Sequence, residues 1–212
     1  MRTALHRLPA ILTGVVVTAV ASCAPGDPEP EDGPPDALPA AEAARALELG
    51  APAADALVQG LVSRLTGVMG EAGTVAALEF CSEEALPLTA QIQDELADPL
   101  DVKRTTLRWR NPENAPDPWE ERILRYLAEL EELDPDAVPA ELTGEGPDGS
   151  LRYYRVLRVA PMCLTCHGAD DAVDAEVREV IQGRYPDDRA VGYEAGELRG
   201  VVRVEIPAAE DR

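Results

Sequence analysis

Residues 159–168 read VAPMCLTCHG, and the rest of the sequence is interpreted around this stretch. Its centre, Cys163-x-x-Cys166-His167, is typical of a c-type haem attachment site. Two thiols three positions apart can add to the two vinyl groups on one edge of a porphyrin. The histidine that follows can then give a neutral imidazole to the iron. We therefore expect one haem c, bound covalently through Cys163 and Cys166, with His167 as an axial ligand.

Two other chemistries fit the same five residues. Without covalent haem, the thiols could form a redox dithiol or one half of a zinc site. Cys81 would complete a set of three cysteines and one histidine, although the adjacent Cys166 and His167 are poorly placed to share one small ion. Haem is favoured because the five-residue pattern is the more specific one and because the N-terminus indicates export.

The first 22 residues have the features of a bacterial export signal. Arg2 and Arg7 give a basic start, and an apolar stretch follows over residues 11–20. Residues 20–23 read VASC and resemble the lipobox of bacterial lipoproteins, which implies cleavage before Cys23 and lipidation of its sulfur. The alternatives are an ordinary signal peptide with an incidental Cys23 and an uncleaved anchor. The uncleaved anchor is disfavoured because the apolar stretch is shorter than the ~20 residues that span a bilayer.

These features divide the chain into three parts. Residues 1–22 are the expected signal peptide, 23–39 a proline-rich tether, and 40–212 the haem domain. We expect a periplasmic protein, anchored to a membrane by the lipid on Cys23. Ala24 is not an inner-membrane retention aspartate, so an outer-membrane destination stays open.

Composition narrows the range of partners. The chain is 45% hydrophobic, enough for a core, but it carries 40 acidic against 19 basic residues and a net charge of −21. Such a charge argues against nucleic acid and against an anionic membrane surface as partners.

Hydrophobic periodicity predicts helices first and strands later, which is typical of an α+β fold with an antiparallel sheet. Leu57, Leu61, Leu65 and Val68 form one helical face, and Gly70 and Gly73 separate it from a second helix that carries Cys81. The remaining elements are a strand over 103–110, a helix from Pro118 with Asp117 and Glu120 as a capping box, a turn-rich connection over 135–150, a strand over 151–159, a helix capped by Asp170 or Asp171, and a strand over 198–206.

Four blocks of sequence occur in an order that resembles the bacterial c-type haem family of PAS-like sensor domains, formerly known only as a domain of unknown function. They are EFCSEE (79–84), RWRNPENAP (108–116), YRVLRVAPMCLTCHG (154–168), and YPDDRA (185–190) with LRG (198–200). The resemblance covers about residues 45–207. It implies a PAS-like antiparallel sheet with flanking N-terminal helices, covalently bound haem, a periplasmic location and a sensing role.

The second axial ligand is the point on which position and resemblance differ. By position alone, Cys81 is best interpreted as a small buried hydrophobe. The family resemblance instead implies an axial pair of His167 and Cys81. Met69, in the glycine-rich turn, and Met162, directly before the motif, are competing sixth ligands.

Haem carries two propionates, which need hydrogen-bond donors. Arg104, Arg108 and Arg110 are candidates, together with the hydroxyl of Tyr153 or Tyr154. Arginines on strands mostly face water, so none of them is singled out by sequence.

The leading functional hypothesis is a lipid-anchored, single-haem cytochrome that senses redox state or a diatomic gas such as NO or CO and acts on a signalling protein. The alternative is electron transfer between envelope redox partners, with the acidic surface steering basic proteins. We expect no enzymatic activity. A peroxidase is disfavoured because His6 leaves with the signal, which leaves His167 as the one histidine of the mature chain.

Overall fold

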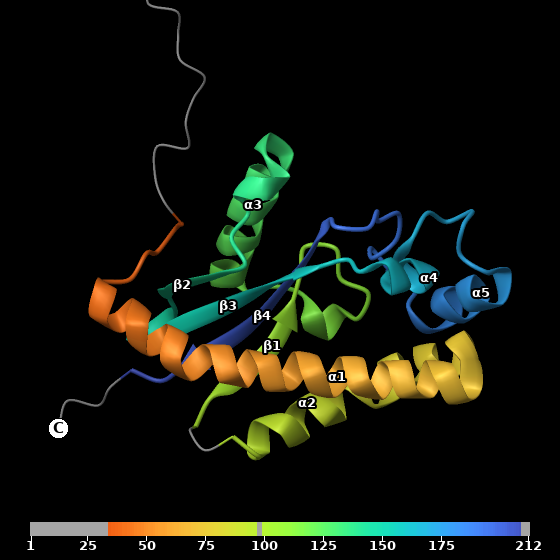
Figure 1. Cartoon of the computed structure of the whole chain (residues 1–212), viewed down its shortest axis with the longest axis horizontal. Helices are drawn as coiled ribbons and strands as arrows, with labels where there is room; N and C mark the ends of the chain where they lie inside the picture. Colours follow the sequence, from red (N-terminus) through yellow and green to blue (C-terminus); the bar gives the residue numbers. More distant parts are fainter. Residues whose placement is uncertain (1–33, 97–98, 209–212) are drawn as a thin grey trace, which may run out of the picture. The chain divides into compact units, whose positions relative to one another are not determined.

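A four-stranded antiparallel sheet with strand order β1-β4-β3-β2 forms the centre of the domain (Figure 1). The computed structural model describes residues 34–96 and 99–208. The strands are β1 (Asp101–Thr105), β2 (Glu141–Glu145), β3 (Leu151–Arg158) and β4 (Leu198–Ile206). The helices are α1 (Ala40–Glu83), α2 (Ala85–Asp94), α3 (Pro118–Leu133), α4 (Leu164–His167) and α5 (Ala175–Arg184), with short 3-10 turns η1 (Pro112–Asn114), η2 (Pro135–Ala137), η3 (Pro147–Gly149) and η4 (Pro161–Cys163). The predicted α+β class is confirmed.

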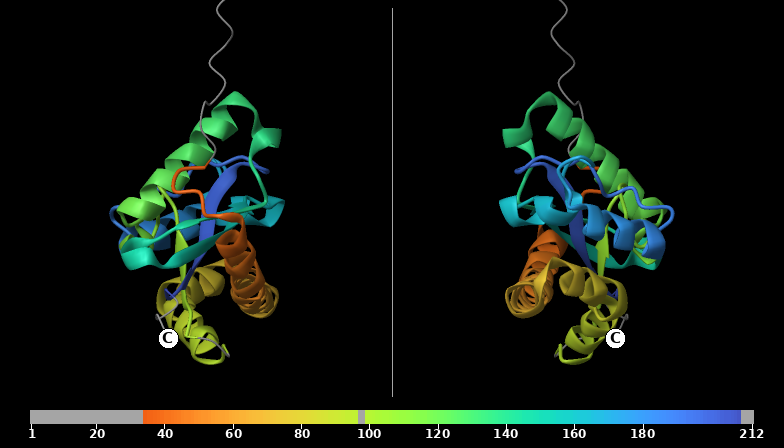
Figure 2. Two further views of the ribbon diagram at one scale, coloured as in Figure 1. Left: turned by 90° about the vertical axis from the view of Figure 1, so that its left-hand side faces the viewer. Right: turned by 90° about the vertical axis from the view of Figure 1, so that its right-hand side faces the viewer.

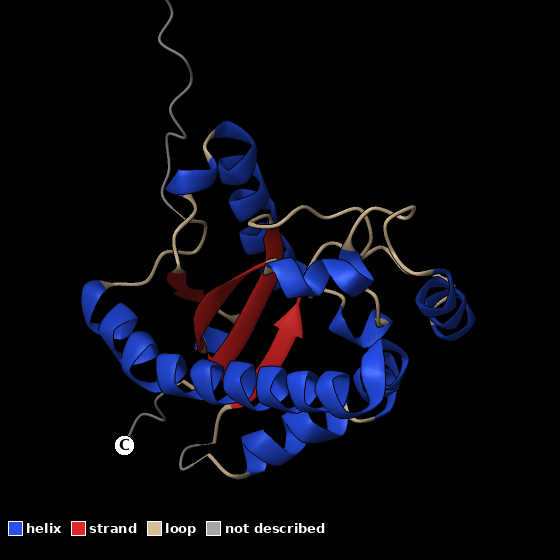
Figure 3. Ribbon diagram, turned by 45° about the vertical axis from the view of Figure 1, so that its right-hand side comes forward, coloured by secondary structure: helices blue, strands red, loops and turns tan. Residues whose placement is uncertain are grey.

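Helices cover both faces of the sheet (Figures 2 and 3). Successive side chains of a strand point to opposite faces, so neighbouring residues belong to different cores. Tyr153 packs with Leu57 of α1 on one face. Its neighbour Tyr154 packs with Ile123 and Leu127 of α3 on the other. The sheet therefore carries two separate apolar cores, one under α1 and one under α3.

The long helix α1 reverses direction at Gly73. This glycine has φ +88°, a left-handed conformation that favours glycine. Arg64 and Glu84 form an ion pair of 3.5 Å across the reversal. Twenty residues of straight helix would separate them by about 30 Å. The break that the sequence predicts near Gly70 and Gly73 is thus confirmed at Gly73, and it creates two arms, residues 40–72 and 74–83.

Strand β1 is shorter than predicted, because it ends at Thr105 and not at Arg110. Its pairing with β4 stops where Gly200 takes φ +145°. A Cβ on Gly200 would lie 2.5 Å from the carbonyl oxygen of Thr105, so the two backbones approach too closely there for a side chain. Arg108 and Arg110 therefore leave the sheet and lie in the loop that follows.

Two further boundaries differ from the sequence prediction. The segment 135–150 was predicted as a connection, yet it contains strand β2, paired with β3 at the edge of the sheet. Gly144 within it faces the backbone of Asp36, whose carbonyl oxygen accepts a hydrogen bond from the N–H of Glu145. The cap of α5 is Asp174, which accepts from the N–H of Glu176, and neither Asp170 nor Asp171.

A network of buried charges holds the start of α3 against the sheet. The predicted capping box of Asp117 and Glu120 is present. Glu120 is fully buried and pairs with Lys103 at 2.8 Å and Arg203 at 3.0 Å. Asp117 accepts two hydrogen bonds from Arg152, at 3.1 and 2.7 Å. Burial opposes ionisation of Asp117, but the bonds from Arg152 and from backbone N–H groups outweigh it, and its pKa lies below the ordinary value.

The predicted signal peptide and Cys23 lie outside the described residues. Within residues 34–96 and 99–208, no helix has the length and apolar character needed to cross a membrane.

Removal of the Glu120 charge is expected to destabilise the domain. Glu120→Gln leaves Lys103 and Arg203 without their shared carboxylate, and a broken buried pair typically costs ~3–5 kcal/mol. The free energy of unfolding, measured by urea titration, should fall by that amount. The control is Glu121→Gln, whose exposed pair with Arg125 should contribute less than ~1 kcal/mol. Equal losses in the two variants would contradict a structural role for the buried network.

Candidate functional site

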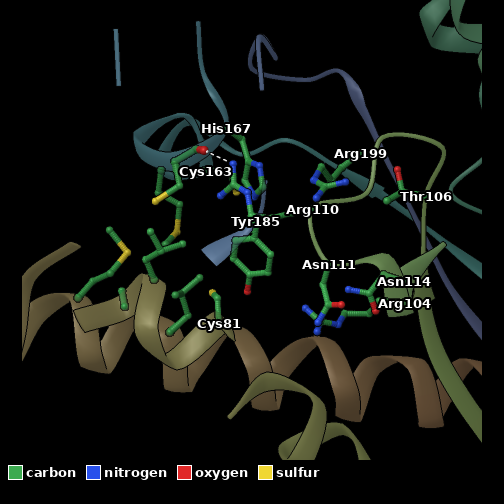
Figure 4. Close-up of a pocket in the computed structure, with 16 residues that line it drawn as sticks. Cys81, Arg104, Thr106, Arg110, Asn111, Asn114, Cys163, His167, Tyr185 and Arg199 are labelled. Atoms are coloured by element: carbon green, nitrogen blue, oxygen red, sulfur yellow. Dashed lines mark hydrogen bonds between the residues drawn. The ribbon is translucent and has the colours of Figure 1, made fainter. Parts of the chain in front are cut away.

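A cavity of about 170 Å³ lies between the two arms of α1, β1 with the loop after it, and the turn that carries the cysteine motif (Figure 4). In Figure 4, Cys81 rises from α1 at the bottom of the cavity, and His167 lies above it on the motif turn. The lining residues are Leu65, Met69, Ala77, Leu78, Cys81, Arg104, Thr106, Arg110, Asn111, Asn114, Met162, Cys163, Cys166, His167, Tyr185 and Arg199.

The motif forms a tight helical turn at the end of β3. Pro161 begins the 3-10 turn η4, where a fixed φ and a missing N–H are tolerated, and the chain continues directly into α4. Cys163 and Cys166 are three positions apart, so they lie on the same face of this turn. Gly168 ends it by donating its N–H to the carbonyl oxygen of Leu164 at 2.9 Å. A Cβ on Gly168 would lie 2.7 Å from that oxygen, so the turn requires a glycine there.

His167 is held as a neutral imidazole with one nitrogen committed. Its Nδ1 lies 2.7 Å from the carbonyl oxygen of Ala190. A carbonyl can only accept, so Nδ1 carries the proton and the Nε2 lone pair stays free. Burial, followed by the charges of Arg199 and Arg110, lowers the pKa of His167 to about 3. A neutral imidazole with a free Nε2 is the form in which histidine binds a metal.

Arg110 ties the motif turn to the loop before β4. Its guanidinium donates to the carbonyl oxygens of Cys166, at 2.7 Å, and Ala190, at 3.2 Å. Asp188 neutralises it at 3.1 Å, with both side chains largely buried. The N–H of Tyr193 adds a bond of 2.9 Å to the carbonyl oxygen of His167. The position of the imidazole is therefore fixed by two segments that are distant in sequence.

Cys81 reaches the cavity from the second arm of α1. Its thiol is free, as are those of Cys163 and Cys166. Burial raises the pKa of Cys81, while the charges of Arg104 and Arg110 act in the opposite direction. Both competing sulfur ligands from the sequence, Met69 and Met162, also line the cavity, so its walls bring together all the predicted sulfur donors.

The structure separates the residues predicted as propionate partners. Arg104 and Arg110 line the cavity. Arg108 does not; its guanidinium stacks 3.7 Å from the centre of the Tyr193 ring and donates to the carbonyl oxygen of Val191. The three arginines thus have different contacts, although the sequence predicts the same role for all three.

The two tyrosines predicted with them lie away from the cavity. Tyr154 is buried in the core beneath α3, on the opposite face of the sheet. The hydroxyl of Tyr153 donates to Glu141 at 2.5 Å. Neither is a lining residue, so the expected hydroxyl contact from Tyr154 does not fit its position. The alternation of the strand places Tyr154 on the far face, and this could not be read before the sheet was known.

Sequence reasoning missed five polar lining residues. They are Thr106, Asn111, Asn114, Tyr185 and Arg199. All of them except Thr106 lie in blocks that carry the family resemblance, which was the one signal available. Their role depends on loops that meet only in the folded chain.

The arrangement does not match a closed zinc site. Within the part of the chain that the structure describes, no three histidine, cysteine, aspartate or glutamate side chains converge on one metal position. Cys81 lies across the cavity from His167 (Figure 4). The cavity instead holds free thiols, one free imidazole nitrogen and three guanidiniums on opposite walls, and this set fits a flat, anionic metal cofactor such as haem.

Comparison with known proteins identifies relatives of this chain. The family model of the Tll0287-like proteins matches residues 36–207. The chain belongs to the Tll0287-like family. A solved structure similar to it is that of the cyanobacterial haem protein Tll0287, with 28% sequence identity and a TM-score of 0.55. The match covers 78% of this chain and 98% of Tll0287. No curated protein matches the chain.

The family match includes every residue of the cavity, because its walls run from Leu65 to Arg199. It starts at Asp36, whose carbonyl oxygen is bonded to Glu145 in β2. The part of the chain shared with the Tll0287-like family is therefore the sheet, the helices over it and the cavity.

The pKa of His167 predicts a pH dependence of stability in cofactor-free protein. A pKa depressed from ~6.5 to about 3 contributes stability above ~pH 6.5, which is lost as pH falls toward 3. The loss should be roughly 1.4 kcal/mol per pH unit below 6.5. Urea unfolding of wild type and His167→Gln between pH 7 and 4.5 measures it as the difference in slope. Identical slopes would show that the imidazole is not buried in this way.

Proposed function

We propose that this chain is a c-type cytochrome with one haem, attached through Cys163 and Cys166 and ligated by His167. The observation that carries the proposal is the single cavity whose walls hold both thiols of the motif, the free imidazole nitrogen and a further free thiol, that of Cys81. Membership of the Tll0287-like family, which includes a haem protein, supports the same cofactor.

The residues of the motif have separate tasks in holding the cofactor. Each thiol adds across one vinyl double bond, with sulfur bonding to one carbon and the hydrogen to the other, so the addition needs no oxidant and has no leaving group. His167 stays neutral because it is buried, and its Nε2 is available because Nδ1 donates to Ala190. Arg110 holds the turn in place through the carbonyl oxygen of Cys166.

Covalent attachment is tested by mass. Exported protein should gain ~600 Da, the mass of one haem, and keep its colour after denaturation. Cys163→Ala and Cys166→Ala should each leave one thioether, and the double variant should lose colour on denaturation. Cys81→Ala is the matched control, because it removes a cavity thiol outside the motif and should leave the mass gain unchanged. Colourless wild-type protein, or a mass without the added group, would end the proposal.

We further propose Cys81 as the ligand opposite His167. Its place across the cavity from the imidazole supports this assignment. The charges of Arg104 and Arg110 favour the thiolate, which is the form that binds metal, whereas burial favours the neutral thiol. Burial is the larger effect and raises the pKa of Cys81, so the thiol must lose its proton when it binds a metal and can regain it on release. Bound haem would supply a one-electron couple and, when a ligand leaves, an open position for a diatomic gas.

Electron paramagnetic resonance distinguishes the sulfur ligands. Ferric wild-type protein should give a low-spin thiolate signal. Cys81→Ala should lose it, while Met69→Leu and Met162→Leu should keep it, because these keep the thiol and most of the apolar volume. A ferric spectrum that is unchanged in Cys81→Ala but altered in Met69→Leu would return Cys81 to the core and favour Met69.

The function that we propose on this basis is sensing of redox state or of NO or CO, without enzymatic turnover. Release of Cys81 on reduction would free the second arm of α1, which is connected to the first arm through Gly73. Electron transfer to basic partners is the second candidate, and the net charge of −21 favours it.

Carbon monoxide separates the two roles. A sensor with a releasable Cys81 should bind CO in the ferrous state and show slow, hysteretic voltammetry. An electron-transfer protein should keep both protein ligands in both states and give a fast, reversible wave. Cys81→Ala is the positive control, because it should bind CO in either case. Failure of ferrous wild type to bind CO, beside binding by the variant, would exclude gas sensing.

We also propose that the chain is a periplasmic lipoprotein anchored through Cys23. The VASC segment after an apolar stretch supports this. Cys23→Ser should move the protein from the membrane fraction to the soluble periplasmic fraction, whereas Cys81→Ser should leave it in the membrane fraction. Retention of Cys23→Ser in the membrane would favour an uncleaved anchor.

A further inference from the structure

Two arginines on the wall of the cavity have no carboxylate partner among the residues that the structure describes. Arg104 on β1 makes no ion pair with any described residue, and its Nε is buried without a hydrogen-bond partner. Arg199 on β4 donates to the carbonyl oxygen of Arg108 at 3.2 Å and lies near the ring of Tyr193. By contrast, Arg110 beside them is neutralised by Asp188.

This lack of partners is unusual for an acidic protein. A buried charge without a counter-charge costs several kcal/mol, so such groups are almost always paired. The chain has 40 acidic residues to choose from, and it neutralises the buried cations Arg152 and Arg203 beneath α3 with Asp117, Glu120 and their neighbours. Burial is the largest cause of a lowered pKa at both Arg104 and Arg199, although the charge of Asp188 acts in the opposite direction on Arg199. Arg104 and Arg199 are half-buried in the cavity wall, so an anionic ligand in the cavity would stabilise both.

The position of the two arginines identifies that charge. In haem, the two vinyl groups occupy neighbouring pyrroles and the two propionates occupy the other two, at the opposite edge. Cys163 lies on one side of the cavity, and Arg104 and Arg199 lie on the other (Figure 4). Asn111 and Asn114 adjoin Arg104 there and add amide donors. A haem attached at the cysteine side would direct its propionates toward these cations.

We propose that Arg104 and Arg199 bind the two haem propionates and that their charges raise the reduction potential. The inference rests on the proposed function, because it needs a haem in the cavity. It also separates the arginines of this region into those that bind other protein groups and those that bind the ligand, a distinction that the sequence does not show. Arg108 and Arg110 have partners within the protein, whereas Arg199, which the sequence analysis did not select, receives a ligand contact.

The test measures the reduction potential of holoprotein for Arg104→Gln and Arg199→Gln. Reduction adds negative charge, so loss of a nearby cation should lower the ratio of reduced to oxidised protein at a fixed potential by about tenfold for each variant. Arg104→Lys and Arg199→Lys keep the charge and should recover most of the ratio. Arg125→Gln, an equal charge change at an exposed site on α3, should leave it nearly unchanged.

Infrared difference spectra of the redox transition provide a direct readout of the propionates. With haem labelled with ¹³C at the propionate carboxyls, the carboxylate bands should shift in Arg104→Gln and Arg199→Gln but not in Arg125→Gln. Unchanged bands, or a ratio that falls equally in Arg125→Gln, would overturn the inference. A potential that varies with added phosphate at constant ionic strength would also overturn it, because a dissolved anion would then fill the site.

The controls separate this inference from the proposed function. Wild type without covalent haem defeats the proposed function itself. The second case is wild type that carries haem, with Arg104→Gln and Arg199→Gln showing the same potential and infrared bands as Arg125→Gln. This result defeats only the assignment of Arg104 and Arg199 to the propionates. The lysine variants cover the case in which a glutamine variant fails to fold, because they keep a cation on the cavity wall.

Discussion

The hydrogen bond between His167 and the carbonyl oxygen of Ala190 is the contact on which the site depends. It selects the tautomer that leaves Nε2 free, and it fixes the plane of the imidazole. The same oxygen accepts from Arg110, which also holds the carbonyl of Cys166. The carbonyl oxygen of Ala190 therefore contacts both His167 and Arg110, so it links the orientation of the histidine to the position of the turn that carries both cysteines. Without the loop around Ala190, the motif would be three reactive side chains without a defined direction.

The features of the site that were predictable are those encoded locally. Five adjacent residues specify the motif and its helical turn, and their chemistry is readable without the fold. The capping box of α3 and the glycine break in α1 are local as well, because each depends on backbone preferences over a few residues. Cys81 was a different case. Its sequence position indicated only a buried helix residue, and the family resemblance was needed to direct attention to the cavity.

The remaining features depend on contacts between distant segments. Arg104, Arg108 and Arg110 alternate like residues of one strand, yet β1 ends at Thr105 because Gly200 of β4 lies against it. Strand β2 has one buried leucine, Leu142, and its pairing with β3 supplies the rest of its stabilisation. Asp188 neutralises Arg110 from 78 residues away, which no pattern in the sequence could show. Which arginine is free to meet a ligand is thus a tertiary property.

The wide separation along the chain between the two walls of the cavity has a consequence for biogenesis. The motif turn needs only a short local segment, whereas the wall with Cys81 forms once the reversed arm of α1 has docked beneath it. Local structure generally forms faster than long-range structure. In the cytochrome proposed above, the cysteines of the turn could therefore react before the second wall has formed, and the bound haem would then offer an apolar surface against which the two arms of α1 pack.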